Sequence, residues 1–168
     1  MGATGVAHVG FGLVSLVVGS LVLFLAKGTT THRALGTTLV LCLFGLNLTA
    51  LLIYRVFGGF GPFHALSVLN LIILLAGFAS AVVKWPRTRW LRNHYYLMGW
   101  AYVGLLTATG AEIMVRVPGV PWMWAVVAPS LLIPIAGGAY VSLHQRRTMA
   151  RLAAHSGGSA LQGEMLDR

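Results

Sequence analysis

Residues 93–116, NHYYLMGWAYVGLLTATGAEIMVR, decide the fold class of this 168-residue chain. His94 and Glu112 stand near the two ends of this stretch, and no charged side chain lies between them. The two residues are eighteen positions apart, or five helical turns, so a helix would project both from one face about 27 Å apart. That distance approaches the thickness of the hydrocarbon core of a bilayer. The stretch is therefore predicted to be a membrane-spanning helix.

The composition of the whole chain extends this prediction. Hydrophobic residues make up 57% of the sequence and charged residues only 9%, which indicates an integral membrane protein. Four further apolar runs have spanning length: residues 4–26, 32–54, 62–83 and 121–143. We predict an all-α bundle of five transmembrane helices, with four in the core and the fifth peripheral. Residues 1–143 would form one domain, and residues 144–168 a basic and then Gly/Ser-rich cytoplasmic tail.

The positive charges predict orientation. The net charge is +9, but ten of the twelve Lys and Arg residues fall in loops 27–33 and 84–93 or in the tail, and only Arg55 and Arg116 lie on the other side. By the positive-inside rule the N-terminus is outside and the C-terminus inside, as in a multi-pass protein of the bacterial inner membrane. Because the cations act as topology signals, the expected partner is the lipid bilayer and not nucleic acid.

Histidines recur at the ends of the first four spans. His8 and His64 begin the first and third spans at the outer face, whereas His32 and His94 begin the second and fourth at the inner face. In an up-down-up-down bundle the first and third helices are diagonal across the core, and so are the second and fourth. Each diagonal thus carries one histidine pair at one depth.

Such pairs fit b-type haem, which takes an imidazole from each side between facing helices. His8 with His64, and His32 with His94, are the candidate cofactor-binding residues for haem b, and transmembrane electron transfer is the leading function. Small residues on these helices could clear space for porphyrin rings: Gly12, Ser15, Gly19, Gly36, Gly77 and Gly99.

Glu112 supports an alternative function, because an intramembrane carboxylate is a candidate functional residue. His8, His64 and Glu112 fall at similar depth, and two imidazoles with a carboxylate can hold zinc, iron or copper. A metal-binding membrane protein is therefore the second interpretation. Glu112 could instead form an i,i+4 ion pair with Arg116.

A third interpretation assigns no chemistry to the chain. Residues 121–143 contain no charged side chain and carry Pro129 and Pro134, which should kink the helix. This span could dock an accessory subunit against a larger membrane complex. The sequence contains no nucleotide site and no nucleophile with its base, so no enzymatic reaction is assigned.

The motifs THRALG, GPFHALSVLNLIILLAGF and HYYLMGWAYVGLLTATGAE resemble a family of bacterial predicted membrane proteins classed as a domain of unknown function. The likeness covers about residues 5–116 and implies functional sites without naming a reaction. It points to His8, His32, Arg33, Gly36, Phe63, His64, His94, Met98 and Glu112. The alternation of histidines is also similar in layout to transmembrane di-haem cytochromes b.

Overall fold

The computed structural model describes residues 2–54 and 58–166, and side chains in the last helix up to residue 148, except at position 146. Arg55 and Arg168, two of the cations used to predict orientation, lie outside the described residues. The described chain is all-helical. Its five helices are α1 (Ala3–Phe24), α2 (Thr30–Leu51), α3 (Pro62–Val83), α4 (Trp90–Met114) and α5 (Trp122–Leu166).

Local chemistry sets several helix ends. Lys27 caps the C-terminal end of α1, since its ammonium donates to the carbonyls of Val22 at 2.6 Å and Leu23 at 3.0 Å. The Thr29 side chain accepts a hydrogen bond from the backbone N–H of His32 and caps α2. Pro62 occupies the first turn of α3, where its missing N–H costs nothing.

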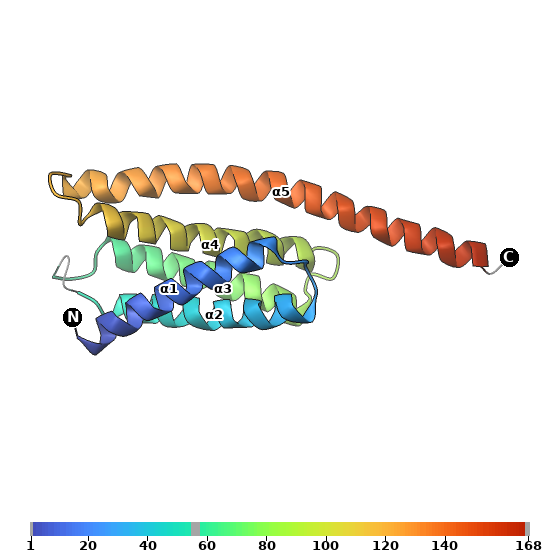
Figure 1. Cartoon of the computed structure of the whole chain (residues 1–168), viewed down its shortest axis with the longest axis horizontal. Coiled ribbons are helices and arrows are strands. Elements are labelled where there is room, and N and C mark those ends of the chain that lie inside the picture. The colour runs from blue at the N-terminus through green and yellow to red at the C-terminus, as the bar shows by residue number, and fades with distance from the viewer. Residues whose placement is uncertain (1, 55–57, 167–168) are drawn as a thin grey trace.

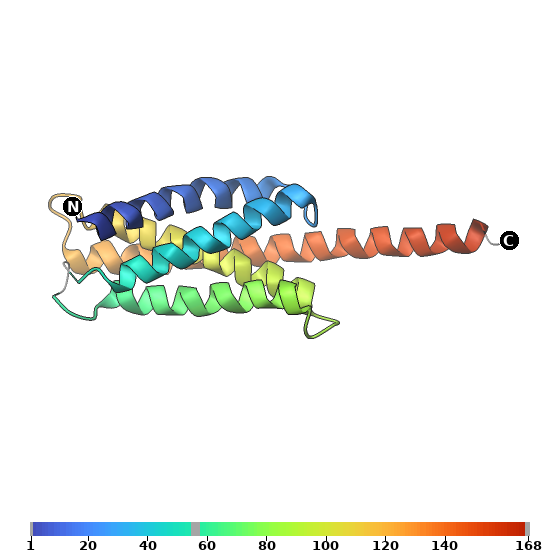
Figure 2. The same cartoon turned by 90° about the horizontal axis from the view of Figure 1, so that it is seen from below.

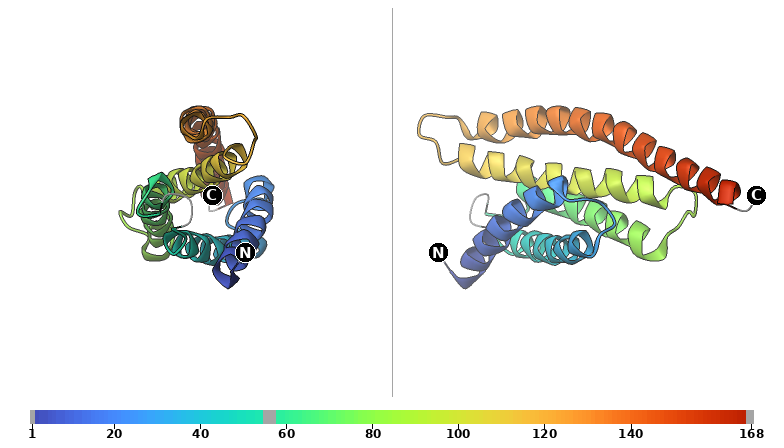
Figure 3. Two further views of the ribbon diagram at one scale, coloured as in Figure 1. Left: turned by 90° about the vertical axis from the view of Figure 1, so that its left-hand side faces the viewer. Right: turned by 45° about the vertical axis from the view of Figure 1, so that its right-hand side comes forward.

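The first four helices form a ring. Each packs against the next along the chain, and α1 closes the ring on α4, so α1 faces α3 across one diagonal and α2 faces α4 across the other. The end-on view in Figure 3 shows this ring with α5 outside it, against α4. The predicted four-helix core with a peripheral fifth helix is confirmed.

Four helices of the described chain, α1, α2, α3 and the Trp122–Gln145 part of α5, are long and apolar enough to cross a membrane. Helix α4 is not apolar enough to count as a membrane span by composition alone, although it runs alongside the other helices through the bundle (Figure 1). It is enclosed by α3, α5 and α1, and its buried residues are Ala101, Tyr102, Val103, Leu105, Thr107 and Ala111. A helix that faces protein tolerates polar residues that a lipid-facing helix would not.

The centre of the ring is packed with side chains. The apolar cluster consists of Leu39, Val40, Leu43, Leu74, Ala101, Tyr102 and Leu105. Tyr102 reaches from α4 to α1, where its hydroxyl lies 2.8 Å from Ser20 Oγ and donates to the Leu16 carbonyl at 3.2 Å. A Cβ at Gly19 would overlap the Tyr102 ring, so this glycine accommodates a side chain of the protein itself.

Helix α5 passes through Pro129 and Pro134 as one continuous helix with a gentle bow and no sharp kink (Figure 1). It extends well beyond the bundle at the end where α2 and α4 begin (Figures 1 and 2). The residues assigned to the tail therefore continue the fifth span as helix, up to Leu166.

Candidate functional site

The histidines lie at the two ends of the ring as the sequence predicted. His32 and His94 stand in the first turns of α2 and α4, at what we call the basic end, which also carries the loops with Lys27 and Lys84. His8 near the start of α1 and His64 in the first turn of α3 stand at the opposite end.

His94 is held by a backbone carbonyl of the neighbouring helix. Its Nδ1 lies 2.9 Å from the oxygen of Gly77, and because a carbonyl only accepts, Nδ1 carries the proton. In a neutral ring this leaves the lone pair on Nε2. An imidazole held through Nδ1–H in this way is the usual arrangement of a metal-ligating histidine.

His32 on α2 and His94 on α4 belong to the second diagonal, and both stand at the basic end. The Nδ1 of His32 is buried and has no hydrogen-bond partner. Lys27 lies outside the spans, where partial burial lowers the pKa of its ammonium. A Cβ at Gly36, one turn beyond His32 on the same helix, would meet no atom within 4 Å, so the space beside Gly36 is open.

His8 bonds to a helix adjacent to its own. Its Nδ1 lies 3.0 Å from the hydroxyl of Thr49 on α2. That hydroxyl donates its own proton to the carbonyls of Gly45 at 2.8 Å and Leu46 at 2.9 Å, so it accepts from His8. Nδ1 is therefore the protonated nitrogen of His8, and Nε2 keeps its lone pair.

His64 is arranged differently, although it is the most buried of the four at 2% exposure. Its Nδ1 accepts a hydrogen bond of 3.1 Å from the backbone N–H of Gly61, which caps α3. The rings of Tyr54 and Phe60 stack on it with centroids at 4.7 and 5.3 Å. The neutral ring then carries its proton on Nε2, which is buried without a partner, so in this arrangement Nε2 offers no lone pair to a metal.

Glu112 forms the predicted ion pair with Arg116, at 2.5 Å between Oε2 and Nη1, and the same guanidinium donates to the Glu112 carbonyl. The charge of Glu112 also acts on His8. Within the described residues, however, no three His, Cys, Asp or Glu side chains are grouped closely enough to hold a metal ion. The structure thus does not bring His8, His64 and Glu112 together as a three-ligand cluster.

This ion pair leads to a prediction of small effect. The side chain of Arg116 is 69% exposed and that of Glu112 35%, so solvent screens the pair. Replacing Arg116 by Gln should lower the free energy of unfolding in detergent by at most about 1 kcal/mol. Denaturant titration measures this, with Arg33→Gln as the control. A loss of several kcal/mol would mean that Glu112 is buried in the working protein.

Of the six small residues expected to clear space for porphyrin rings, Ser15 is fully buried with no hydrogen-bond partner for its Oγ, and the five glycines divide into two groups. Gly19 makes room for Tyr102, a Cβ at Gly77 would lie 3.0 Å from Leu97 Cβ, and one at Gly99 would lie 2.9 Å from Val141. The expectation that these three clear space for a porphyrin is wrong, because they allow close packing of helices. Gly36 has open space, and a Cβ at Gly12 would make only an ordinary contact with Leu46 at 3.6 Å.

Sequence reasoning missed the role of the buried Tyr102. Tyr102 sits in an apolar run, and only its partner Ser20, eighty-two residues away, reveals that it joins α1 to α4. Asn70 is 8% exposed, its Oδ1 has no hydrogen-bond partner, and Gly104 provides the space for it. Asn47 is 4% exposed and donates to the Leu43 carbonyl of its own helix at 2.7 Å.

Comparison with known proteins supports the membrane assignment. The model of a family described as "Predicted membrane protein (DUF2306)" matches residues 5–152. The chain belongs to this family. The DUF2306 match extends past residue 116 and includes the spanning part of α5, which the sequence resemblance had left outside. No curated protein and no solved structure matches the chain.

Proposed function

We propose that this DUF2306 protein transfers electrons across a bacterial inner membrane through b-type haem, with His32 and His94 as the primary ligand pair. The observation that carries the proposal is the His94–Gly77 hydrogen bond, which leaves Nε2 of His94 with a free lone pair on the diagonal that His32 shares. The unpartnered Nδ1 of His32 and the open space at Gly36 support the same pair.

The chemistry of the donors fits a six-coordinate haem iron, which takes two neutral imidazoles. When bound, the haem would supply a one-electron carrier that no side chain provides. The chain's own residues hold the rings: Gly77 fixes the orientation of His94, and the cations Lys27, Arg33 and Arg92 at the basic end could pair with propionates.

The outer pair has weaker support. His8 offers Nε2, but His64 would have to release the Gly61 N–H and move its proton from Nε2 to Nδ1 before it could bind iron. A second haem on His8 and His64 is therefore proposed as secondary to the first. Electron transfer across the whole bilayer requires this second haem or another electron acceptor at the outer face.

The experiment is the optical spectrum of the detergent-purified full-length protein from a host that makes haem. We expect a Soret band and, after reduction with dithionite, a sharp α-band, with about one haem per chain if only His32 and His94 bind it. Haem-replete expression that yields folded protein without these bands would eliminate the proposal.

The metal alternative, with zinc, iron or copper on His8, His64 and Glu112, has less support than haem, because the described residues do not group these three side chains. Because Glu112 is paired with Arg116, such a site would require that pair to open. Metal analysis of the colourless protein would test it, with Glu112→Ala expected to release the ion.

An accessory role is favoured by one observation on α5. The side of α5 that is not packed on α4 exposes large apolar side chains, Leu131, Leu132 and Ile135, and the helix continues beyond the span. Residues 121–143 would then dock against a larger membrane complex. If replacing all four histidines left the partner's activity intact, this function would replace electron transfer.

A further inference from the structure

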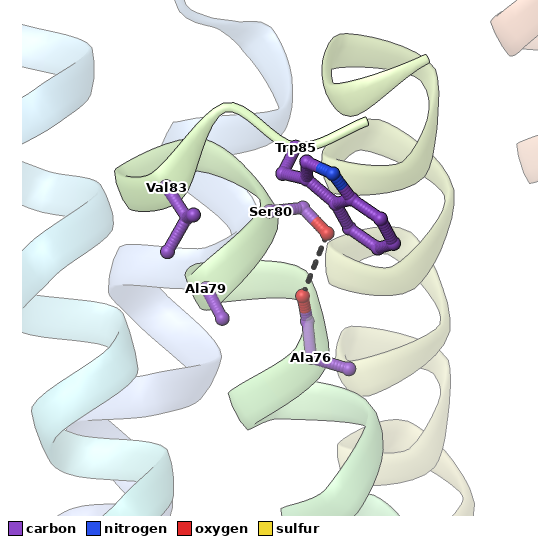
Figure 4. A pocket seen from close by; sticks show the side chains of 5 residues that line it. All are labelled: Ala76, Ala79, Ser80, Val83 and Trp85. Carbon is purple, nitrogen blue, oxygen red and sulfur yellow. Dashed lines mark hydrogen bonds between the residues drawn. The ribbon is translucent and has the colours of Figure 1, made fainter. Parts of the chain in front are cut away.

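A shallow hollow of about 220 Å³ opens on the outer surface of α3 at the basic end. Four residues of α3 and one residue of the following loop line it: Ala76, Ala79, Ser80, Val83 and Trp85. Figure 4 shows the Trp85 indole folded back beside Ser80, above the small side chains of the last turns of α3. The positions 76, 79, 80 and 83 follow helical spacing, so they form one continuous strip.

The hollow is apolar at its base. The only hydroxyl there, that of Ser80, donates to the Ala76 carbonyl of its own helix at 2.8 Å and has no second proton to offer. Ala76, Ala79 and Val83 are exposed, and Trp85 is 71% exposed. Tryptophan beside an apolar helix end is typical of the membrane interface. Such a surface suits an acyl chain.

The loop that supplies Trp85 to the hollow, which we call its rim, is basic. Lys84 directly follows α3, and Arg87 and Arg89 lie in the same short loop, all three exposed. In the described part of the chain none of these three cations forms an ion pair. Glu112 pairs with Arg116 instead, near the end of α4 and at the opposite end of the bundle. Lys84 directly precedes Trp85 of the hollow, and its Nζ lies 6.0 Å from the ring centroid of Trp90 at the start of α4.

We propose that this hollow and its rim bind one anionic phospholipid of the adjacent leaflet. One acyl chain would lie against Ala76, Ala79 and Val83, and the phosphate would face Lys84, Arg87 and Arg89. A zwitterionic lipid could fill the hollow equally well, but the cationic group of its own headgroup would offset the attraction of its phosphate to three unpaired cations. Charge complementarity therefore selects the anionic class. The proposal does not depend on the haem assignment.

The test uses the full-length protein purified in detergent and titrated with phosphatidylglycerol or phosphatidylcholine, with bound lipids counted by native mass spectrometry. For the wild type we expect one phosphatidylglycerol retained at least tenfold more tightly than phosphatidylcholine. Arg87→Gln should weaken it about fivefold, the change that corresponds to about 1 kcal/mol for one basic residue at an anionic surface. Arg33→Gln removes an equal charge at the same end of the bundle and should change binding less than twofold.

A second variant distinguishes lipid binding in the hollow from general electrostatic attraction to the basic loop. Ala79→Leu fills the hollow while leaving every cation in place, and should weaken phosphatidylglycerol at least fivefold. Ala76→Leu serves the same purpose if Ala79→Leu loses helix content by circular dichroism. Equal binding of the two lipids, equal effects of Arg87→Gln and Arg33→Gln, or unchanged binding in the filled variant would each overturn the proposal.

Discussion

Replacing His32 or His94 by alanine is expected to remove the haem bands of the purified protein, with at least a tenfold fall in α-band absorbance per chain. Each substitution takes one of two axial imidazoles from the pair that the His94–Gly77 hydrogen bond supports. A haem with one protein ligand would bind weakly or change to a high-spin spectrum. The measurement is the dithionite-reduced minus oxidised difference spectrum.

The matched control is His144→Ala. His144 also lies at the basic end, but it is exposed and stacks on Tyr140 of its own helix at 4.5 Å between ring centroids. Its removal should leave the spectrum unchanged. His8→Ala and His64→Ala should leave the first haem in place and remove only a second one. Bands that survive both His32→Ala and His94→Ala would contradict the assignment of this pair.

The second large effect concerns packing. Gly19→Ala is expected to lower the free energy of unfolding by about 1–3 kcal/mol, the usual cost of overpacking. A Cβ at position 19 would overlap the ring of Tyr102, which is anchored by Ser20 and Leu16 and cannot withdraw freely. Denaturant titration in detergent, monitored by circular dichroism, measures the change.

Gly10→Ala provides the control in the same helix. A Cβ there would meet no atom within 4 Å, so the substitution should be neutral or stabilising by up to about 1 kcal/mol through its helix propensity. Tyr102→Leu should cancel most of the Gly19→Ala cost, as a double-mutant cycle would show. Equal effects of the two glycine substitutions would mean that Tyr102 does not occupy this space.

The fold was predictable from sequence because its signals are local or periodic. Apolar runs of spanning length predicted five helices, and the short loops between them predicted an up-down-up-down order and so which helix ends meet. The Glu112–Arg116 pair was predictable for the same reason, since residues four apart on a helix are neighbours. Helix α4 was identified as a span by its uncharged stretch, although its composition is less apolar than that of its neighbours.

The details of the site depend on contacts between helices, which no spacing rule provides. That Gly77 accepts from His94, and that Gly19 receives Tyr102, follows from the rotation and register of neighbouring helices. His64 was a partial exception. Its position two residues after Pro62, in the first turn, could have identified it as a capping residue, since that turn leaves unbonded N–H groups.

Lys27 has a consequence for experiments on topology. Its ammonium closes the carbonyl end of the first helix, and the same charge belongs to the cluster from which orientation was predicted. Neutralising Lys27 would remove its hydrogen bonds to the end of α1 as well as one of the positive charges that orient the protein. An inverted or mixed insertion would then have two causes. Reporter fusions that vary Arg33 instead would isolate the sorting signal alone, because that guanidinium secures no helix terminus in the described chain.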